Sequence, residues 1–320
     1  MRYAFGNAQD IGQREGQQDA FGFSDPDHTG FCAHGGFLAV LADGMGGLEH
    51  GEMASRAAVK VFIDTYLTKS TDEEIPQALA RALVAAQQKV LELAAQAQLG
   101  TTLVAAVLHQ ASMYWISVGD SALYHVRGNE LTQVNRPHVY ALDLDARVLA
   151  GELSLEQALA DPQRESLTSY LGMANLQLVD RNLRPMPMAE TDALLLASDG
   201  LFKTIGPAAF PRRNGDAQDY CEQLMNAALA VSAPGQDNIT ILMLEPARVR
   251  EVFEPITIAP ERRWGQWVAV AVLLICGIAA AYWSGLKEKK PAIVSNPSVA
   301  PGKERFDNSK LPAVNELVEP

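Results

Sequence analysis

Residues 37–47 read Phe-Leu-Ala-Val-Leu-Ala-Asp-Gly-Met-Gly-Gly, six apolar residues followed by a charged residue and a glycine-rich turn. The apolar run predicts a buried strand, because short runs that end at a turn are typical of strands in a protein core. Asp43 stands at the end of that strand, where an ionised carboxylate without a partner carries a large free-energy cost. The stretch therefore predicts a sheet with a charged end that needs a cation.

Three more aspartates stand at one end of an apolar, strand-like run: Asp19 before residues 20–23, Asp199 after residues 193–198 and Asp237 before residues 238–244. Lysine and arginine are scarce in these segments, so a divalent metal is the simplest common partner. Oxygen ligands without Cys or His predict Mg²⁺ or Mn²⁺ rather than Zn²⁺. For any single aspartate the alternative is an Asx turn before glycine. Four in one domain favour the metal site.

The charge of the chain argues against nucleic acid as a partner. The net charge is −12, and residues 1–260 hold 18 Lys and Arg against 32 Asp and Glu. Binding to a phosphate backbone requires clustered basic residues. The three cysteines lack the spacing of a zinc site or of a disulfide framework, which suits a reducing compartment.

The pattern of apolar residues predicts an α+β domain. Helices are expected at residues 51–67, 74–98 and 219–231, and strands at residues 37–42, 101–109, 113–118, 122–126, 192–198 and 239–244. Strands that follow strands, with helices grouped apart, favour layered antiparallel sheets over a parallel sheet. Residues 138–163 lack strand character and predict an inserted helical flap.

Residues 264–286 contain no charged residue, and the segment 267–283 is almost wholly apolar with aromatic rings near its ends. A run of this length predicts a single transmembrane helix, and the alternative is a buried core helix. No signal peptide is recognised at the N-terminus, so we expect the large domain on the cytoplasmic side of the inner (plasma) membrane. The expected organisation is a catalytic domain (1–246), a linker (247–263), the membrane helix (264–286) and a proline-containing disordered tail (287–320).

Six motifs occur in order along residues 1–246: Gly-Gln-Arg-Glu-Gly-Gln-Gln-Asp-Ala-Phe (12–21), Leu-Ala-Asp-Gly-Met-Gly-Gly (41–47), Gly-Thr-Thr (100–102), Val-Gly-Asp-Ser (118–121), Ser-Asp-Gly-Leu (198–201) and Gln-Asp-Asn-Ile-Thr (236–240). In sequence and order they resemble the motifs of the protein phosphatase 2C family. The resemblance implies a four-layer α-β-β-α sandwich with two central antiparallel sheets and with metal ions at one end.

The resemblance also implies a set of metal ligands. Asp43 would bridge two Mn²⁺ or Mg²⁺ ions, and the carbonyl of Gly44 would coordinate one of them. Asp199 and Asp237 would hold the other ion. Asp120, together with Asp199, would match a third and weaker metal site.

Two residues are implied as catalytic. Arg14 would clamp the phosphate of the substrate, for which a planar guanidinium is well shaped. Asp19 would orient metal-bound water, and it is also counted among the residues of the metal site. Met45 stands where some family members carry a histidine, so no general acid is identified. His138, in a loop beside proline, is a candidate to touch the substrate, and the alternative is a solvated ring or one that caps a turn.

The function implied is metal-dependent hydrolysis of phosphoserine and phosphothreonine in proteins, with a water that bridges two metal ions as the nucleophile. The expected partners are phosphorylated proteins, a cognate Ser/Thr kinase at the membrane, and the membrane itself. The alternative is a catalytically weak, membrane-anchored module that binds phosphoproteins or regulates a partner.

Overall fold

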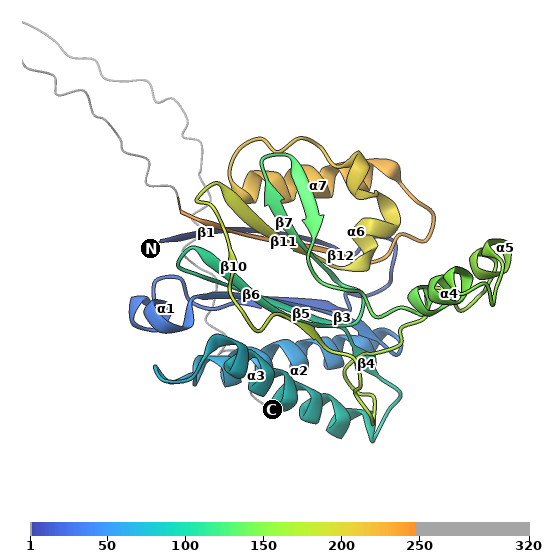
Figure 1. Ribbon diagram of the computed structural model, residues 1–320, viewed down its shortest axis with the longest axis horizontal. Coiled ribbons are helices and arrows are strands. Elements are labelled where there is room, and N and C mark those ends of the chain that lie inside the picture. The colour runs from blue at the N-terminus through green and yellow to red at the C-terminus, as the bar shows by residue number, and fades with distance from the viewer. Residues whose placement is uncertain (1, 248–320) are drawn as a thin grey trace, which may run out of the picture. The chain divides into compact units, whose positions relative to one another are not determined.

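The computed structural model describes residues 2–247, and the predicted membrane helix and tail lie outside these residues. Two antiparallel sheets form the centre (Figure 1). One has the order β1 (Tyr3–Asp10), β12 (Ile239–Pro246), β11 (Asp192–Ala197), β7 (Ala122–Arg127) and β8 (Glu130–Gln133). The other has the order β10 (Met186–Pro187), β6 (Ser112–Val118), β5 (Leu103–His109), β3 (Phe37–Met45) and β2 (Asp19–Phe23), with β4 (Gly100–Thr101) on β3 and β9 (Asp180–Arg181) on β6. The α+β prediction is confirmed.

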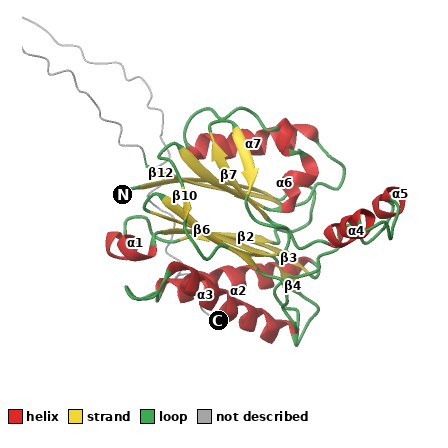
Figure 2. Cartoon of the chain, in the orientation of Figure 1, coloured by secondary structure: helices red, strands yellow, loops and turns green. Residues whose placement is uncertain are grey.

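Helices cover the outer face of each sheet (Figure 2). On the β2–β3–β5 side lie α2 (Leu48–Leu67) and α3 (Ile75–Ala94), with the short α1 (Thr29–Gly35) near β5. On the β1–β12 side lie α6 (Asp199–Thr204) and α7 (Ala217–Val231), joined by a 3-10 turn (Pro207–Ala209). A capping box between Glu74 and Gln77 begins α3, and helical spacing buries one face of that helix.

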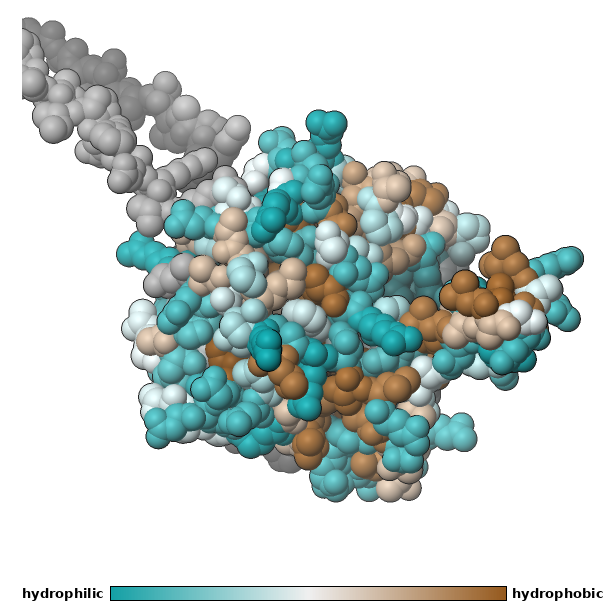
Figure 3. Space-filling model, viewed as in Figure 1, coloured by the Kyte–Doolittle hydropathy of each residue, from teal (hydrophilic) through white to brown (hydrophobic). Residues whose placement is uncertain are grey.

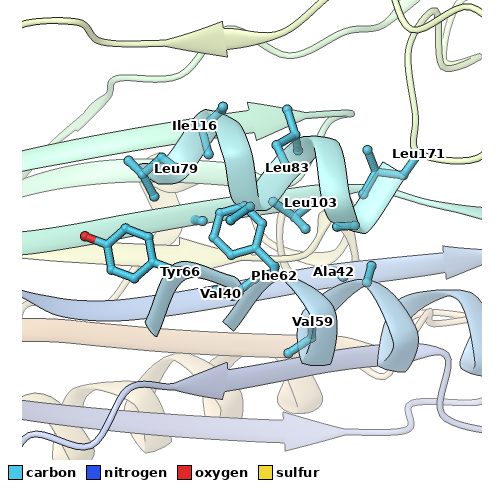
Figure 4. Packing of buried hydrophobic residues seen from close by; sticks show 14 of the residues in the cluster. Val40, Ala42, Val59, Phe62, Tyr66, Leu79, Leu83, Leu103, Ile116 and Leu171 are labelled. Atoms are coloured by element: carbon cyan, nitrogen blue, oxygen red, sulfur yellow. The ribbon is translucent and has the colours of Figure 1, made fainter. Parts of the chain in front are cut away.

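The apolar run of β3 is continuous because both of its faces are buried. Phe37 and Leu41 point into the layer between the sheets, together with Leu242 and Leu244 of β12. The alternate residues Leu38, Val40 and Ala42 point to α2 and α3, where they pack with Phe62, Tyr66 and Leu83 (Figure 4). A third layer packs β11 and β12 on α7. Side chains that alternate between two apolar layers produce the four-layer arrangement.

The predicted flap is present as an insertion between β8 and β9. It carries α4 (Tyr140–Leu149) and α5 (Leu155–Leu159), which project from the sandwich (Figure 1). Leu149, Leu155 and Leu159 are at least 59% exposed, and apolar residues are visible on this projection in Figure 3. Within residues 2–247, no helix combines the length and the apolar character that crossing a membrane requires.

Candidate active site

A pocket of about 340 Å³ brings together four of the predicted carboxylates. It is lined by Asp43, Asp120, Asp199 and Asp237, by Arg14 and Gly44, and by Gln18, Met45, Gly46, Thr102, Glu165, Leu167, Lys203 and Asn238. Asp19 adjoins this set, because Asp19 and Asp43 face each other directly in the antiparallel pair β2–β3. The structure therefore gathers all seven residues implied as metal ligands or catalytic groups, whereas the candidate His138 lies elsewhere.

The backbone of Asp43 is held on both sides. Its N–H donates to Thr102 Oγ1 (2.9 Å), and its carbonyl accepts from the Thr102 N–H (2.8 Å) and from Thr101 Oγ1 (2.8 Å). These contacts fix the end of β3 and leave the carboxylate to the pocket. Burial and the charges of neighbouring aspartates, Asp19 first, raise the pKa of Asp43 well above its usual range.

Gly44 lies at a close backbone approach. A Cβ at this position would lie 2.1 Å from the carbonyl oxygen of Gly51 in α2 and 2.7 Å from that of Gln18. The Gly44 N–H donates to the Gln18 carbonyl (3.1 Å). Only glycine fits here, so the end of β3 can lie directly against the first turn of α2.

Asp19 is 4% exposed and is held by the opposite sheet. Its Oδ2 accepts from Ser198 Oγ (2.8 Å) and from Thr240 Oγ1 (2.7 Å). Its Oδ1 is buried and has no hydrogen-bond partner among residues 2–247. Burial raises the pKa of Asp19 to about 6 although the two hydroxyl groups lower it.

Asp199 opens α6, and Lys203 lies one turn further along the same helix. The Lys203 ammonium forms an ion pair with Asp199 Oδ2. The other oxygen, Asp199 Oδ1, is buried and has no hydrogen-bond partner within the described residues. Burial alone lowers the pKa of Lys203, but the charges of Asp199, Asp120 and Asp237 more than offset this, so its pKa is raised. Lys203 lines the pocket but was not among the residues predicted for the site.

Arg14 is in the pocket, but its guanidinium is paired with a carboxylate. Arg14 Nε and Nη2 donate to the two oxygens of Asp237, both at 2.9 Å. The loop that carries Arg14 is tied to Asn238, whose Nδ2 donates to the carbonyls of Ile11 (2.8 Å) and Gly16 (3.1 Å). The Arg14 side chain remains 50% exposed, so the fork can also reach an anion that enters from solvent.

Asp120 follows Gly119, which has a φ of +101° and is bonded to His138 on both sides. The Gly119 N–H donates to His138 Nδ1 (3.1 Å), and the His138 N–H donates to the Gly119 carbonyl (2.9 Å). Burial lowers the pKa of His138, which keeps the ring neutral. His138 therefore positions the turn before Asp120, and it lines a separate pocket of about 310 Å³ rather than the carboxylate pocket. Burial and the charge of Asp199 raise the pKa of Asp120 to about 7.

The donor set fits a hard divalent cation. Five acidic side chains and only two basic ones line the pocket, and Asp19 adds a sixth carboxylate beside it. Within residues 2–247, no three His, Cys, Asp or Glu side chains lie in an arrangement that could hold a metal ion as they stand. In place of such a site, Arg14 and Lys203 each hold one carboxylate. The unpartnered buried oxygens of Asp19 and Asp199 and the excess of oxygen ligands are what Mg²⁺ or Mn²⁺ would satisfy.

Comparisons with known proteins identify the family to which the chain is similar. The family model described as Protein phosphatase 2C matches residues 9–238. The serine/threonine phosphatase stp of Listeria welshimeri serovar 6b is 31% identical over 217 residues, 65% of this chain and 84% of that protein. The structure of the S. agalactiae serine/threonine phosphatase is 26% identical with a TM-score of 0.63, and the match covers 77% of this chain and all (100%) of that one.

A further solved structure, the catalytic domain of the phosphatase PstP in complex with 2 manganese ions, is 22% identical (TM-score 0.58, 76% of this chain and 97% of that one) and shares the fold. The chain belongs to the protein phosphatase 2C family. It is accordingly a protein serine/threonine phosphatase.

Proposed function

We propose that this chain hydrolyses phosphoserine and phosphothreonine in proteins with two Mn²⁺ or Mg²⁺ ions held by Asp43, Gly44, Asp199 and Asp237. One observation carries the proposal: carboxylates from both sheets converge on one pocket, and the basic residues that line this pocket are too few to neutralise them. The unpartnered oxygen of Asp199 supports the same ligand set. Divalent ions would supply Lewis-acid polarisation of the phosphoryl group and an acidified water.

The residues of the chain position the reactants. Arg14 exchanges Asp237 for the phosphate of the substrate, because a guanidinium fork matches two phosphate oxygens. Asp19 orients the attacking water: its Oδ2 is occupied by Ser198 and Thr240, so only Oδ1 can accept a hydrogen bond from that water. In-line attack requires this kind of fixed orientation more than any covalent chemistry by the protein.

The test is phosphate release from a phosphothreonine peptide by the full chain in detergent, with Mn²⁺ and with chelator. We expect Asp43→Asn to lower the rate by about a thousandfold, in line with the loss of a central electrostatic group. Asp64→Asn, on the exposed side of α2, serves as the matched control. Turnover that survives both the chelator and Asp43→Asn would contradict the proposal. Tight, metal-dependent peptide binding without phosphate release would favour the binding module instead.

The membrane location is a separate part of the proposal. We infer that residues 264–286 anchor the chain in the inner membrane with the catalytic domain in the cytoplasm, where it opposes a Ser/Thr kinase. The uncharged run and its flanking aromatic and basic residues support this. Deletion of residues 264–286 should move the chain from the membrane fraction to the soluble fraction with phosphatase activity intact. Recovery of the deleted chain only as insoluble protein would mean that the segment belongs to the core.

A further inference from the structure

Lys203 is one of the two basic residues that line the carboxylate pocket. It lies four residues after Asp199, and two exposed residues at this spacing commonly pair without consequence, as Lys60 and Asp64 do on α2. The two pairs differ in their carboxylates, because Asp64 is 58% exposed whereas Asp199 is 16% exposed. Lys203 also lines the pocket together with Asp120 and Asp237. Its ammonium group therefore neutralises charge within the site.

The position of Lys203 bears on the third metal site. The resemblance to the family implies a weak site formed by Asp120 and Asp199. In the structure, Asp199 Oδ2 is already engaged by Lys203, and the only oxygen of Asp199 without a partner among residues 2–247 is Oδ1. A third metal ion would thus meet one ligand oxygen fewer and a fixed positive charge beside it. Both effects weaken the binding of a cation.

We propose that Lys203 is the third cation of this site, so that the chain binds two divalent ions and its own ammonium group replaces the third. This inference rests on the proposed two-metal function. A tethered ammonium group is always present at Asp199, whereas a weakly bound ion is present only at high concentration. Asp120 then serves as a second acidic neighbour of Lys203 and not as a metal ligand.

The test counts the bound metal ions directly. The full chain in detergent is stripped with chelator and titrated with Mn²⁺, with calorimetry reporting heat and electron paramagnetic resonance reporting free Mn²⁺. We expect the wild type to bind two ions and Lys203→Met to bind three. The affinity of Lys203→Met for the third ion should be at least about tenfold higher than the affinity of the wild type for a third ion. Lys203→Arg keeps the charge and should retain two ions. Lys60→Met, which removes the matched lysine of α2, should also bind two.

The outcomes separate this inference from the proposed function. Equal third-ion affinity in the wild type and in Lys203→Met overturns the role of Lys203 and leaves the two-metal centre intact. Failure of the wild type to bind any Mn²⁺ overturns the metal centre and the inference together. Circular dichroism establishes that each variant is folded. Lys203→Gln provides the same comparison if the methionine variant is unfolded.

Discussion

Replacing Asp19 by Asn should stabilise the metal-free chain, although Asp19 belongs to the proposed site. The pKa of this buried carboxyl rises from 3.8 to about 6. Two pKa units correspond to about 3 kcal/mol, the cost of keeping the group ionised at pH 8. The Asn amide oxygen still accepts hydrogen bonds from Ser198 and Thr240. Its N–H₂ group, however, would lie at the buried position of Oδ1 without an acceptor, which costs about 1–2 kcal/mol and reduces the gain. The net gain is about 1–2 kcal/mol, or roughly 2–8 °C in Tm.

The sign of the pH dependence follows from the same shift. Because the folded pKa of Asp19 is raised, the folded chain binds more protons than the unfolded chain between about pH 4 and pH 6. The metal-free wild type should therefore become more stable as the pH falls from 8 to 5.5, and Asp19→Asn should respond less. In Mn²⁺ the order of the two proteins should reverse, since binding stabilises the wild type more.

The assay is thermal unfolding of the full chain in detergent, followed by far-ultraviolet circular dichroism in chelator and in Mn²⁺ at both pH values. Asp64→Asn, which removes an exposed carboxylate of α2, should change the Tm little in any condition. If Asp19→Asn melts at or below the wild type in chelator at pH 8, the cost assigned to the buried charge is wrong.

Two further predictions concern Asp192, outside the pocket, and Gly44, which lines it. Asp192 is fully buried and accepts hydrogen bonds from Arg127 (3.0 and 2.8 Å) and His125 (2.8 Å). Asp192→Asn should lower the free energy of unfolding by about 2–3 kcal/mol at pH 7. The hydrogen bond from Arg127 lowers the pKa of Asp192. The loss of unfolding free energy in Asp192→Asn should therefore be complete above about pH 4 and become smaller below it. Chemical denaturation at a series of pH values measures this dependence. Gly44→Ala should weaken Mn²⁺ binding by at least about tenfold in calorimetry, because the new Cβ meets the Gly51 carbonyl; unchanged affinity would contradict the close approach.

Most of the inner strands were predictable from the sequence because they are buried on both faces. A short, continuous apolar run, such as residues 37–42, is most simply interpreted as a buried strand. The strand Tyr3–Asp10 was not predicted, since its residues are mostly half-exposed and Gly6 interrupts it. The structure explains that glycine: a Cβ at Gly6 would lie 2.4 Å from the backbone of Ala217 in α7. A contact between two segments so far apart in the sequence leaves no local pattern.

The aspartates of the site were predictable from the sequence, but Glu165 and the partners of the carboxylates were not. Each aspartate ends or begins an apolar strand, and that signal is local. Which cation each carboxylate holds depends on distances across the fold, such as Arg14 to Asp237, residues 223 positions apart. Lys203 was within reach of sequence reasoning, because it lies at helical spacing from Asp199. The role of His138 was not, because its bond to Gly119 joins two loops without periodicity.

The pocket is fixed by the sandwich behind it, so we expect cation binding to move few groups. Asp19 belongs to β2 in one sheet, and its Oδ2 is held by Ser198 and Thr240, which follow or lie in strands of the other sheet. Leu41 of β3 and Leu242 of β12 lie in the apolar layer between the sheets, two residues from Asp43 and from Thr240. The carboxylates therefore stay close to one another without a metal, at the electrostatic cost seen in their raised pKa values. The long side chain of Arg14 is the part of the site that can swing, because it exchanges Asp237 for phosphate, whereas Lys203 stays with Asp199.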